Sequence, residues 1–93
     1  MSRTLEPNED GVLPCTCGAY PILVEAEVDG GIPPMGYVCL NCHACMRPRK
    51  GKTYGETERI ALDAWNTATI NEHVLAGLID EEEAEFIRRA LER

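Results

Sequence analysis

The sequence predicts an α+β fold: a small antiparallel β-hairpin with a packed α-helix and an additional C-terminal helix. Two patterns predict this order. Apolar and polar residues alternate between positions 22 and 29, and an apolar stripe at three- and four-residue spacing follows position 57. The third observation is size, because 93 residues with one Trp, one Phe and three Tyr can build only a modest core. A domain of this kind often needs a further cross-link to be stable.

The alternating segment is expected to form the first strand of the hairpin. From Val24 onward its apolar positions are separated by acidic residues, and side chains two positions apart on a strand share one face. A loop at 29–34, which contains Gly and Pro, then separates this strand from a return strand within 35–40. The predicted inward face of the first strand comprises Ile22, Val24, Ala26 and Val28.

Two helices are expected to follow the hairpin. Thr57 is the predicted N-cap of the first helix, and Gly77 is the predicted stop after residue 76. Asp80 is predicted to cap the second helix, whose acidic start and basic end suit the helix dipole. The apolar stripe of the first helix comprises Ile60, Ala61, Ala64, Trp65 and Ala68, and that of the second comprises Ala84, Ile87 and Leu91.

We expect three parts along the chain: a flexible acidic N-terminus at residues 1–11, a hairpin-and-helix domain at 12–68 and a C-terminal helical tail at 69–93. The first part lacks the apolar segment of a secretory leader. No apolar run approaches the ~20 residues that cross a bilayer, so no membrane partner is expected. The expected location is the cytoplasm, where thiols stay reduced and clustered cysteines favour metal binding over disulfides.

The formal net charge of -7 is distributed unevenly. Residues 31–54 contain four bases and no acid, whereas the flanking segments are acidic. An acidic surface repels a phosphate backbone. Nucleic acid is therefore expected to bind at most weakly, through Arg47, Arg49, Lys50 and Lys52.

The five cysteines stand in two groups. Cys39-Leu-Asn-Cys42 has the C-x2-C spacing of a zinc knuckle, and His43 occupies the next position, which normally needs a left-handed backbone. The other pair, Cys15-Thr-Cys17, is one residue shorter. Structural Zn²⁺ is usually held by four ligands in a tetrahedron, most often thiolates. The predicted ligands of one Zn²⁺ are therefore Cys15, Cys17, Cys39 and Cys42.

Other ligand sets stay open at this point. Cys45 extends the second group to Cys39-x2-Cys42-x2-Cys45, so it could replace Cys15, and His43 could bind through its imidazole. The same spacing occurs in iron–sulfur sites. The usual continuation of such runs, three residues and then Cys-Pro, does not follow Cys45.

Four sequence blocks occur in a characteristic order: residues 13–18 (LPCTCG), 37–42 (YVCLNC), 56–58 (ETE) and 64–66 (AWN). Together they resemble the Lar-type restriction alleviation proteins of phages and prophages. That family pairs a "CPFCG" block, a hairpin, a second C-x2-C pair and a helix that bears acids and ends in "A-W-N". The resemblance covers about residues 12–67. Here the first pair is one residue shorter, Cys45 is additional, and His43 replaces the usual Gly.

The resemblance implies a zinc-ribbon-like hairpin with a helix packed across it. In such a fold Trp65 covers the small sheet while its indole N–H needs one acceptor, and Asn66 caps a neighbouring backbone segment. The implied function is protection of phage DNA in the host bacterial cytoplasm, by binding a host type I restriction–modification complex or another antiphage defence protein. Residues 69–93 have no counterpart in the family pattern.

No catalysis is expected, because zinc with four thiolates has no open coordination position. His73 is expected at the surface or partly buried rather than as a base. An interaction protein fits best, and the alternative is a zinc-ribbon nucleic-acid-binding accessory or regulatory protein. A homodimer could form through the C-terminal helices, by way of Val74, Leu75, Leu78, Ile87 and Leu91.

Overall fold

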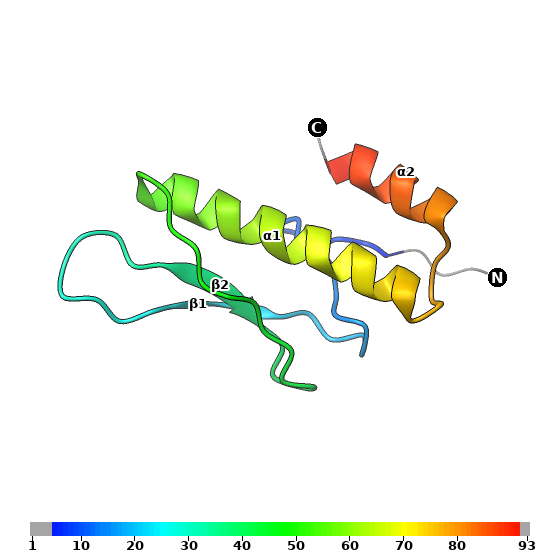
Figure 1. The fold of residues 1–93 in the computed structure, drawn as a ribbon, viewed down its shortest axis with the longest axis horizontal. Helices are drawn as coiled ribbons and strands as arrows, with labels where there is room; N and C mark the ends of the chain where they lie inside the picture. Colours follow the sequence, from blue (N-terminus) through cyan, green and yellow to red (C-terminus); the bar gives the residue numbers. More distant parts are fainter. Residues whose placement is uncertain (1–4, 92–93) are drawn as a thin grey trace.

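The computed structural model describes residues 5–91 and contains two strands and two helices within that range. The order is β1 (Ile22–Glu25), β2 (Met35–Val38), α1 (Tyr54–Leu75) and α2 (Glu81–Leu91). Helix α1 lies in the middle of the molecule, with the hairpin on one side and α2 on the other (Figure 1). This arrangement confirms the predicted α+β fold. Within residues 5–91, neither helix is both long and apolar enough to cross a membrane.

The hairpin is antiparallel, and its register decides which side of β1 faces the helix. Leu23 pairs with Tyr37, and directly paired residues point to the same face of a sheet. Because Tyr37 is buried beneath α1, Leu23 also points inward, and the neighbouring Ile22 and Val24 point outward. They are 45% and 36% exposed. The predicted inward face of this strand is therefore wrong by one residue.

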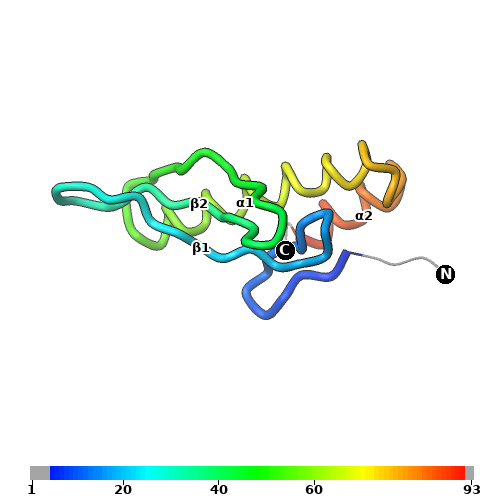
Figure 2. Tube along the Cα trace, turned by 90° about the horizontal axis from the view of Figure 1, so that it is seen from below, coloured from blue at the N-terminus to red at the C-terminus, as the bar shows by residue number. Residues whose placement is uncertain are grey.

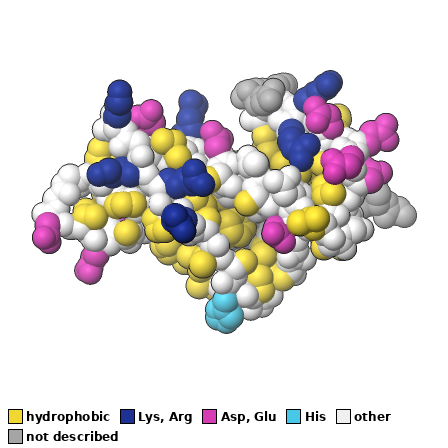
Figure 3. All heavy atoms as spheres, in the orientation of Figure 1, with side chains coloured by type: hydrophobic (Ala, Val, Ile, Leu, Met, Phe, Trp, Pro, Cys, Tyr) yellow, Lys and Arg dark blue, Asp and Glu magenta, His cyan; other side chains and the backbone are white. Residues whose placement is uncertain are grey.

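A third, irregular segment extends the sheet beyond β2. Isolated bridges pair Val38 with Cys45 and Met35 with Arg49. Reciprocal hydrogen bonds of 2.8 Å join the backbone N–H and C=O groups of Met35 and Arg49. The predicted basic loop thus begins as a strand-like segment along β2. Its exposed Lys and Arg side chains contribute to the basic side chains that gather over the hairpin and the start of α1 in Figure 3.

Helix α1 begins one turn earlier than predicted. Thr53 is the N-cap, since its Oγ1 accepts a hydrogen bond from the Glu56 N–H at 3.0 Å. Thr57, the predicted cap, lies inside the helix and is fully buried. Its hydroxyl donates to the Thr53 carbonyl and accepts from the Gly51 N–H, so it connects the helix to the preceding loop. The predicted stop is confirmed, because Gly77 follows α1 with a φ of 78°.

The core has two parts that share α1. The first cluster includes Ala61 and Trp65, as the predicted stripe requires, together with Tyr37 of β2. The second cluster lies between the end of α1 and α2 and includes Ile70 and Ile87. The buried face of α1 changes along its length because its two halves pack against different partners, and this change leaves Ala68 exposed.

His73 belongs to the buried face of the second half of α1. It is only 4% exposed, and its Nδ1 lies 2.8 Å from the Thr69 carbonyl oxygen. The expectation of a surface or partly buried His73 is therefore wrong. Thr69 is buried as well, although neither residue belongs to the predicted apolar stripe.

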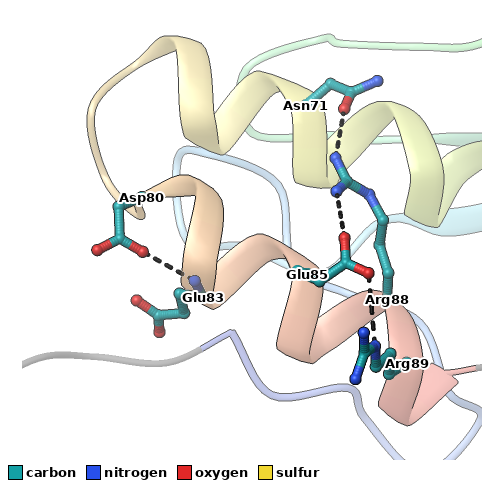
Figure 4. A network of polar contacts seen from close by, with 6 residues as sticks. All are labelled: Asn71, Asp80, Glu83, Glu85, Arg88 and Arg89. Atoms are coloured by element: carbon teal, nitrogen blue, oxygen red, sulfur yellow. Dashed lines mark hydrogen bonds and ion pairs between the residues drawn. The ribbon is translucent and has the colours of Figure 1, made fainter.

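Helix α2 packs its predicted stripe on α1. Ala84 and Ile87 are buried and Leu91 is partly buried against the same cluster. Figure 4 shows Arg88 reaching Asn71 of α1 at 3.1 Å and Glu85 at 3.5 Å. The apolar residues proposed for a homodimer are thus divided. Ile87, Val74 and Leu91 contact the chain's own core, while Leu75 and Leu78 are 81% and 55% exposed.

The start of α2 provides a first testable prediction. Asp80 Oδ1 accepts a hydrogen bond from the Glu83 N–H at 2.8 Å (Figure 4), which confirms the predicted cap. Asp80→Ala removes this acceptor and is expected to lower the free energy of unfolding by ~1 kcal/mol. Urea denaturation followed by circular dichroism measures the change. Asp29→Ala, which removes an exposed acid from the hairpin loop, is the control and should leave the midpoint unchanged.

Candidate metal centre

The first cysteine pair lies in a tight turn before β1. The Cys15 N–H donates to the Ala19 carbonyl and the Gly18 N–H donates to the Cys15 carbonyl, each at 2.8 Å. Gly18 has a φ of 97°, a conformation that glycine adopts without a steric penalty. This backbone reversal brings the Cys15 and Cys17 side chains to the turn that follows β2.

The second pair lies in a similar turn directly after β2. The Cys39 N–H donates to the Ala44 carbonyl and the His43 N–H donates to the Cys39 carbonyl, each at 2.8 Å. His43 has a φ of 67°, which confirms the left-handed backbone predicted after the C-x2-C pair. In both turns the residue after the second cysteine has a positive φ. Figures 1 and 2 show the two turns at the end of the hairpin opposite the 26–34 loop.

The four predicted ligand atoms are brought together. The sulfurs of Cys15, Cys17, Cys39 and Cys42 all lie within 4.8 Å of one another. Two of the separations are 3.3 Å, between the Cys15 and Cys42 sulfurs, and 3.5 Å, between those of Cys17 and Cys39. A disulfide needs about 2.05 Å, so these are free thiols.

The sulfur separations fit a single tetrahedral ion. With Zn–S bonds of about 2.3 Å, tetrahedral geometry places the sulfurs ~3.8 Å apart. The separations of 3.3 and 3.5 Å and the upper limit of 4.8 Å bracket this value. In a four-iron cluster each thiolate binds a different iron, which sets the sulfurs farther apart than on one ion. The spacing is therefore compatible with one bound metal ion and favours a mononuclear centre.

Burial divides the four thiols into an inner and an outer pair. Cys15 and Cys39 are 5% and 0% exposed and belong to the first core cluster. Cys17 and Cys42 are exposed. A metal ion held here would lie at the edge of the core, with two ligands packed under α1 and two facing solvent.

Without a cation, the hydrogen bonds within the site shift the pKa values of Cys17 and Cys42 in opposite directions. Hydrogen bonds from the Asn41 side chain and the Ala19 backbone lower the pKa of Cys17 from 9.0 to about 6. The backbone of Ala44 also stabilises the Cys42 thiolate, but the thiols of Cys15 and Cys39 outweigh it, and the pKa of Cys42 rises to about 12. Without a cation, the cluster therefore favours the thiolate at Cys17 and the protonated thiol at Cys42. A divalent cation among the sulfurs removes this difference, because bound thiols are deprotonated.

Asn41 was not among the predicted site residues, although it lies between the two cysteines of the second turn. Its side chain crosses to the sulfur of Cys17 in the first turn. A polar side chain inside a C-x2-C loop was the only available signal in the sequence. The sequence could not show which thiol it would contact.

Cys45 and His43 lie outside the four-sulfur cluster. Cys45 pairs with Val38, so its side chain shares the outer face of the sheet, opposite to the buried Cys39. The arrangement therefore does not support replacement of Cys15 by Cys45. Within residues 5–91, the four cysteines are the one group of three or more Cys, His, Asp or Glu whose ligand atoms converge on a metal-sized site.

Trp65 and Asn66 of α1 position the segment that leads into the first cysteine turn. The Trp65 indole N–H donates to the Leu13 carbonyl at 2.9 Å, which confirms that this N–H finds an acceptor. Asn66 accepts from the Leu13 N–H at 3.0 Å and donates to the Gly11 carbonyl at 2.9 Å, so it caps a neighbouring backbone segment as expected. The helix thereby fixes the chain two residues before Cys15.

These features define a small α+β protein whose hairpin carries a four-cysteine cluster compatible with a bound metal ion. Comparisons of the chain with protein-family models, with curated proteins and with solved structures give no match.

Proposed function

We propose that the chain is a non-catalytic zinc protein in which one Zn²⁺ joins the two cysteine turns. The observation that carries this proposal is the convergence of four sulfurs from two distant turns within 4.8 Å. Zn²⁺ suits a site of four thiolates, and a site filled by four protein ligands leaves no position for a substrate or a reactive water. The ion then acts as a structural cross-link.

We further propose that the zinc-stabilised fold serves in binding another protein, as an antirestriction protein of the Lar type. The structure supports this proposal as well as the sequence does, because three of the four blocks that carry the resemblance contact one another. The side chains of the AWN block hold the backbone that precedes the first cysteine pair. The YVCLNC block supplies the buried Tyr37, whose ring centroid lies 6.2 Å from that of Trp65. The proposed partner is a host type I restriction–modification complex in the bacterial cytoplasm.

A plating assay tests this function. Unmodified phage is plated on a bacterial host that carries a type I system, with and without expression of the chain. Expression is expected to raise the plating efficiency toward that of an isogenic host without the nuclease, and to change nothing in that second host. Cys39→Ser is the inactive control. Unchanged restriction in cells that contain folded, metal-loaded protein would refute the antirestriction proposal.

A zinc-ribbon nucleic-acid-binding protein is the second candidate, and one observation favours it. Arg47, Arg49, Lys50 and Lys52 are all exposed along the segment beside β2, and the ion pairs within residues 5–91 involve none of them. Binding to duplex DNA that weakens steeply with salt, and that is lost when these four residues are replaced by Gln, would favour this candidate. The first proposal predicts no such salt-dependent DNA binding.

A further inference from the structure

A second concave site lies away from the cysteine turns. A cavity of about 580 Å³ opens between the turn at residues 8–12, the start of β1 and the first half of α1. Asn8 builds the turn, because its side-chain oxygen accepts hydrogen bonds from the N–H groups of Asp10 and Val12 at 2.9 and 3.0 Å. The volume is within the range of small-molecule sites, about 300–1,000 Å³.

Tyr37 lies in the wall of this cavity and is 8% exposed. Its ring packs against Trp65, but no residue in the described range 5–91 is hydrogen-bonded to its hydroxyl. Buried Tyr hydroxyls usually find a partner. Among the described residues, the one fully enclosed side-chain oxygen or nitrogen without a partner belongs to Glu83. The Tyr37 hydroxyl oxygen is therefore not fully enclosed, and Tyr37 is one of the residues that line the cavity.

Two carboxylate residues, Glu58 of α1 and Asp10 of the turn at residues 8–12, line this cavity together with Tyr37. The Tyr37 hydroxyl oxygen can accept a hydrogen bond from a ligand. Arg59 also lines the cavity, yet the ion pairs within residues 5–91 do not join it to either carboxylate. Both acids remain available to a ligand.

The rest of the lining determines the kind of cation that fits. Val12, Leu23 and Leu62 provide apolar walls. The two carboxylates do not form part of any convergent metal-ligand group, and the cavity is much larger than a bare ion. A ligand that combines a cationic head with an apolar stem matches both features, as the side chains of Arg and Lys do.

We propose that this cavity binds an organic cation, a guanidinium or alkylammonium group on a short apolar stem. Its N–H groups donate to the Tyr37 hydroxyl and to the carboxylates of Glu58 and Asp10, while the stem lies against the apolar wall. A basic side chain of a partner protein and a free amine share this chemistry. The cavity lies apart from the four cysteines, none of which lines it, and this inference does not rest on the antirestriction proposal.

The test uses the full metal-loaded chain labelled with ¹⁵N, titrated with N-acetyl-arginine amide and followed by NMR. Saturable shifts are expected for residues around the cavity, and N-acetyl-citrulline amide, which is nearly isosteric but neutral, should cause none. A parallel titration with agmatine tests whether the site binds a free amine. Tighter binding of agmatine indicates a free-amine site, and equal or tighter binding of the blocked arginine indicates a partner side chain. Absence of saturable shifts with both cations would overturn the proposal.

Three variants localise the site. Glu58→Gln is expected to weaken arginine binding about tenfold, because it removes a charged acceptor. Tyr37→Phe removes only the hydroxyl and should weaken binding while the ring packing is retained. Glu72→Gln removes an exposed acid from the other half of α1 and is the matched control. Unchanged affinity in Glu58→Gln, or an equal loss in Glu72→Gln, would contradict the assignment, and the NMR spectrum of each variant reports its folding.

Discussion

Replacing Cys39 with serine is expected to abolish stoichiometric metal binding and to unfold the hairpin. Cys39 is 0% exposed, follows β2 directly and contacts both the sulfur cluster and the first core cluster. Structural zinc sites contribute about 10–16 kcal/mol of apparent binding free energy in zinc-finger peptides. Small domains have only ~5–15 kcal/mol of stability in total. The binding free energy lost with the ion is therefore comparable to or larger than the whole free energy of unfolding of a domain of this size.

Native mass spectrometry with metal analysis, combined with an NMR spectrum, measures both effects. Wild type should carry one zinc ion, and Cys39→Ser should carry none and lose its dispersed amide signals. Cys45→Ser is the matched control, because Cys45 lies outside the cluster and is exposed. It should retain one ion and the native spectrum. Wild-type protein that stays fully folded after a chelator has removed all metal would refute the structural role of the ion.

The second large effect is expected for Trp65. Its side chain is 5% exposed, packs against Tyr37 and donates its indole N–H to the Leu13 carbonyl. Trp65→Ala removes the packing and leaves that carbonyl without its partner, so it should cost ~3–5 kcal/mol of unfolding free energy. Trp65→Phe keeps most of the apolar volume and should cost ~1–3 kcal/mol, mainly for the lost hydrogen bond.

Urea denaturation of the metal-loaded variants measures these costs. Phe86→Ala is the control, because this aromatic residue is 71% exposed on α2 and its removal should change stability by less than ~0.5 kcal/mol. Trp65→Ala and Phe86→Ala with equal midpoints would show that α1 does not hold the N-terminal segment in place. A cost confined to Trp65→Ala supports the contact between the helix and the lead into the first cysteine turn.

Local rules predicted much of this molecule. Asp80 caps α2 and Gly77 follows α1 because short polar side chains and glycine have backbone preferences that act within one turn. The C-x2-C spacing and the left-handed His43 also follow from a few adjacent residues. For the same reason, two chelating turns could be identified in the sequence as halves of one candidate site.

The predictions were wrong where two residues close together in the sequence fitted the local pattern equally well. Ile22 and Leu23 could each face inward on an alternating strand, and the pairing of Leu23 with Tyr37 selects Leu23. Thr53 and Thr57 could each cap a helix. The Gly51 N–H donates to the hydroxyl of Thr57, and Thr53 is the residue whose hydroxyl caps α1. In each case a contact with a distant or non-helical segment made the choice.

The sequence by itself determined the order of the elements, the positions of the two cysteine turns, and the residues that end α1 and begin α2. Only the tertiary structure decided which four sulfurs converge, which face of β1 is buried, and that the buried face of α1 shifts to include Thr69 and His73. The physical reason is the range of the interactions. Capping and turn formation depend on neighbours along the chain, whereas burial and ligand convergence depend on how α1 packs against the hairpin on one side and α2 on the other.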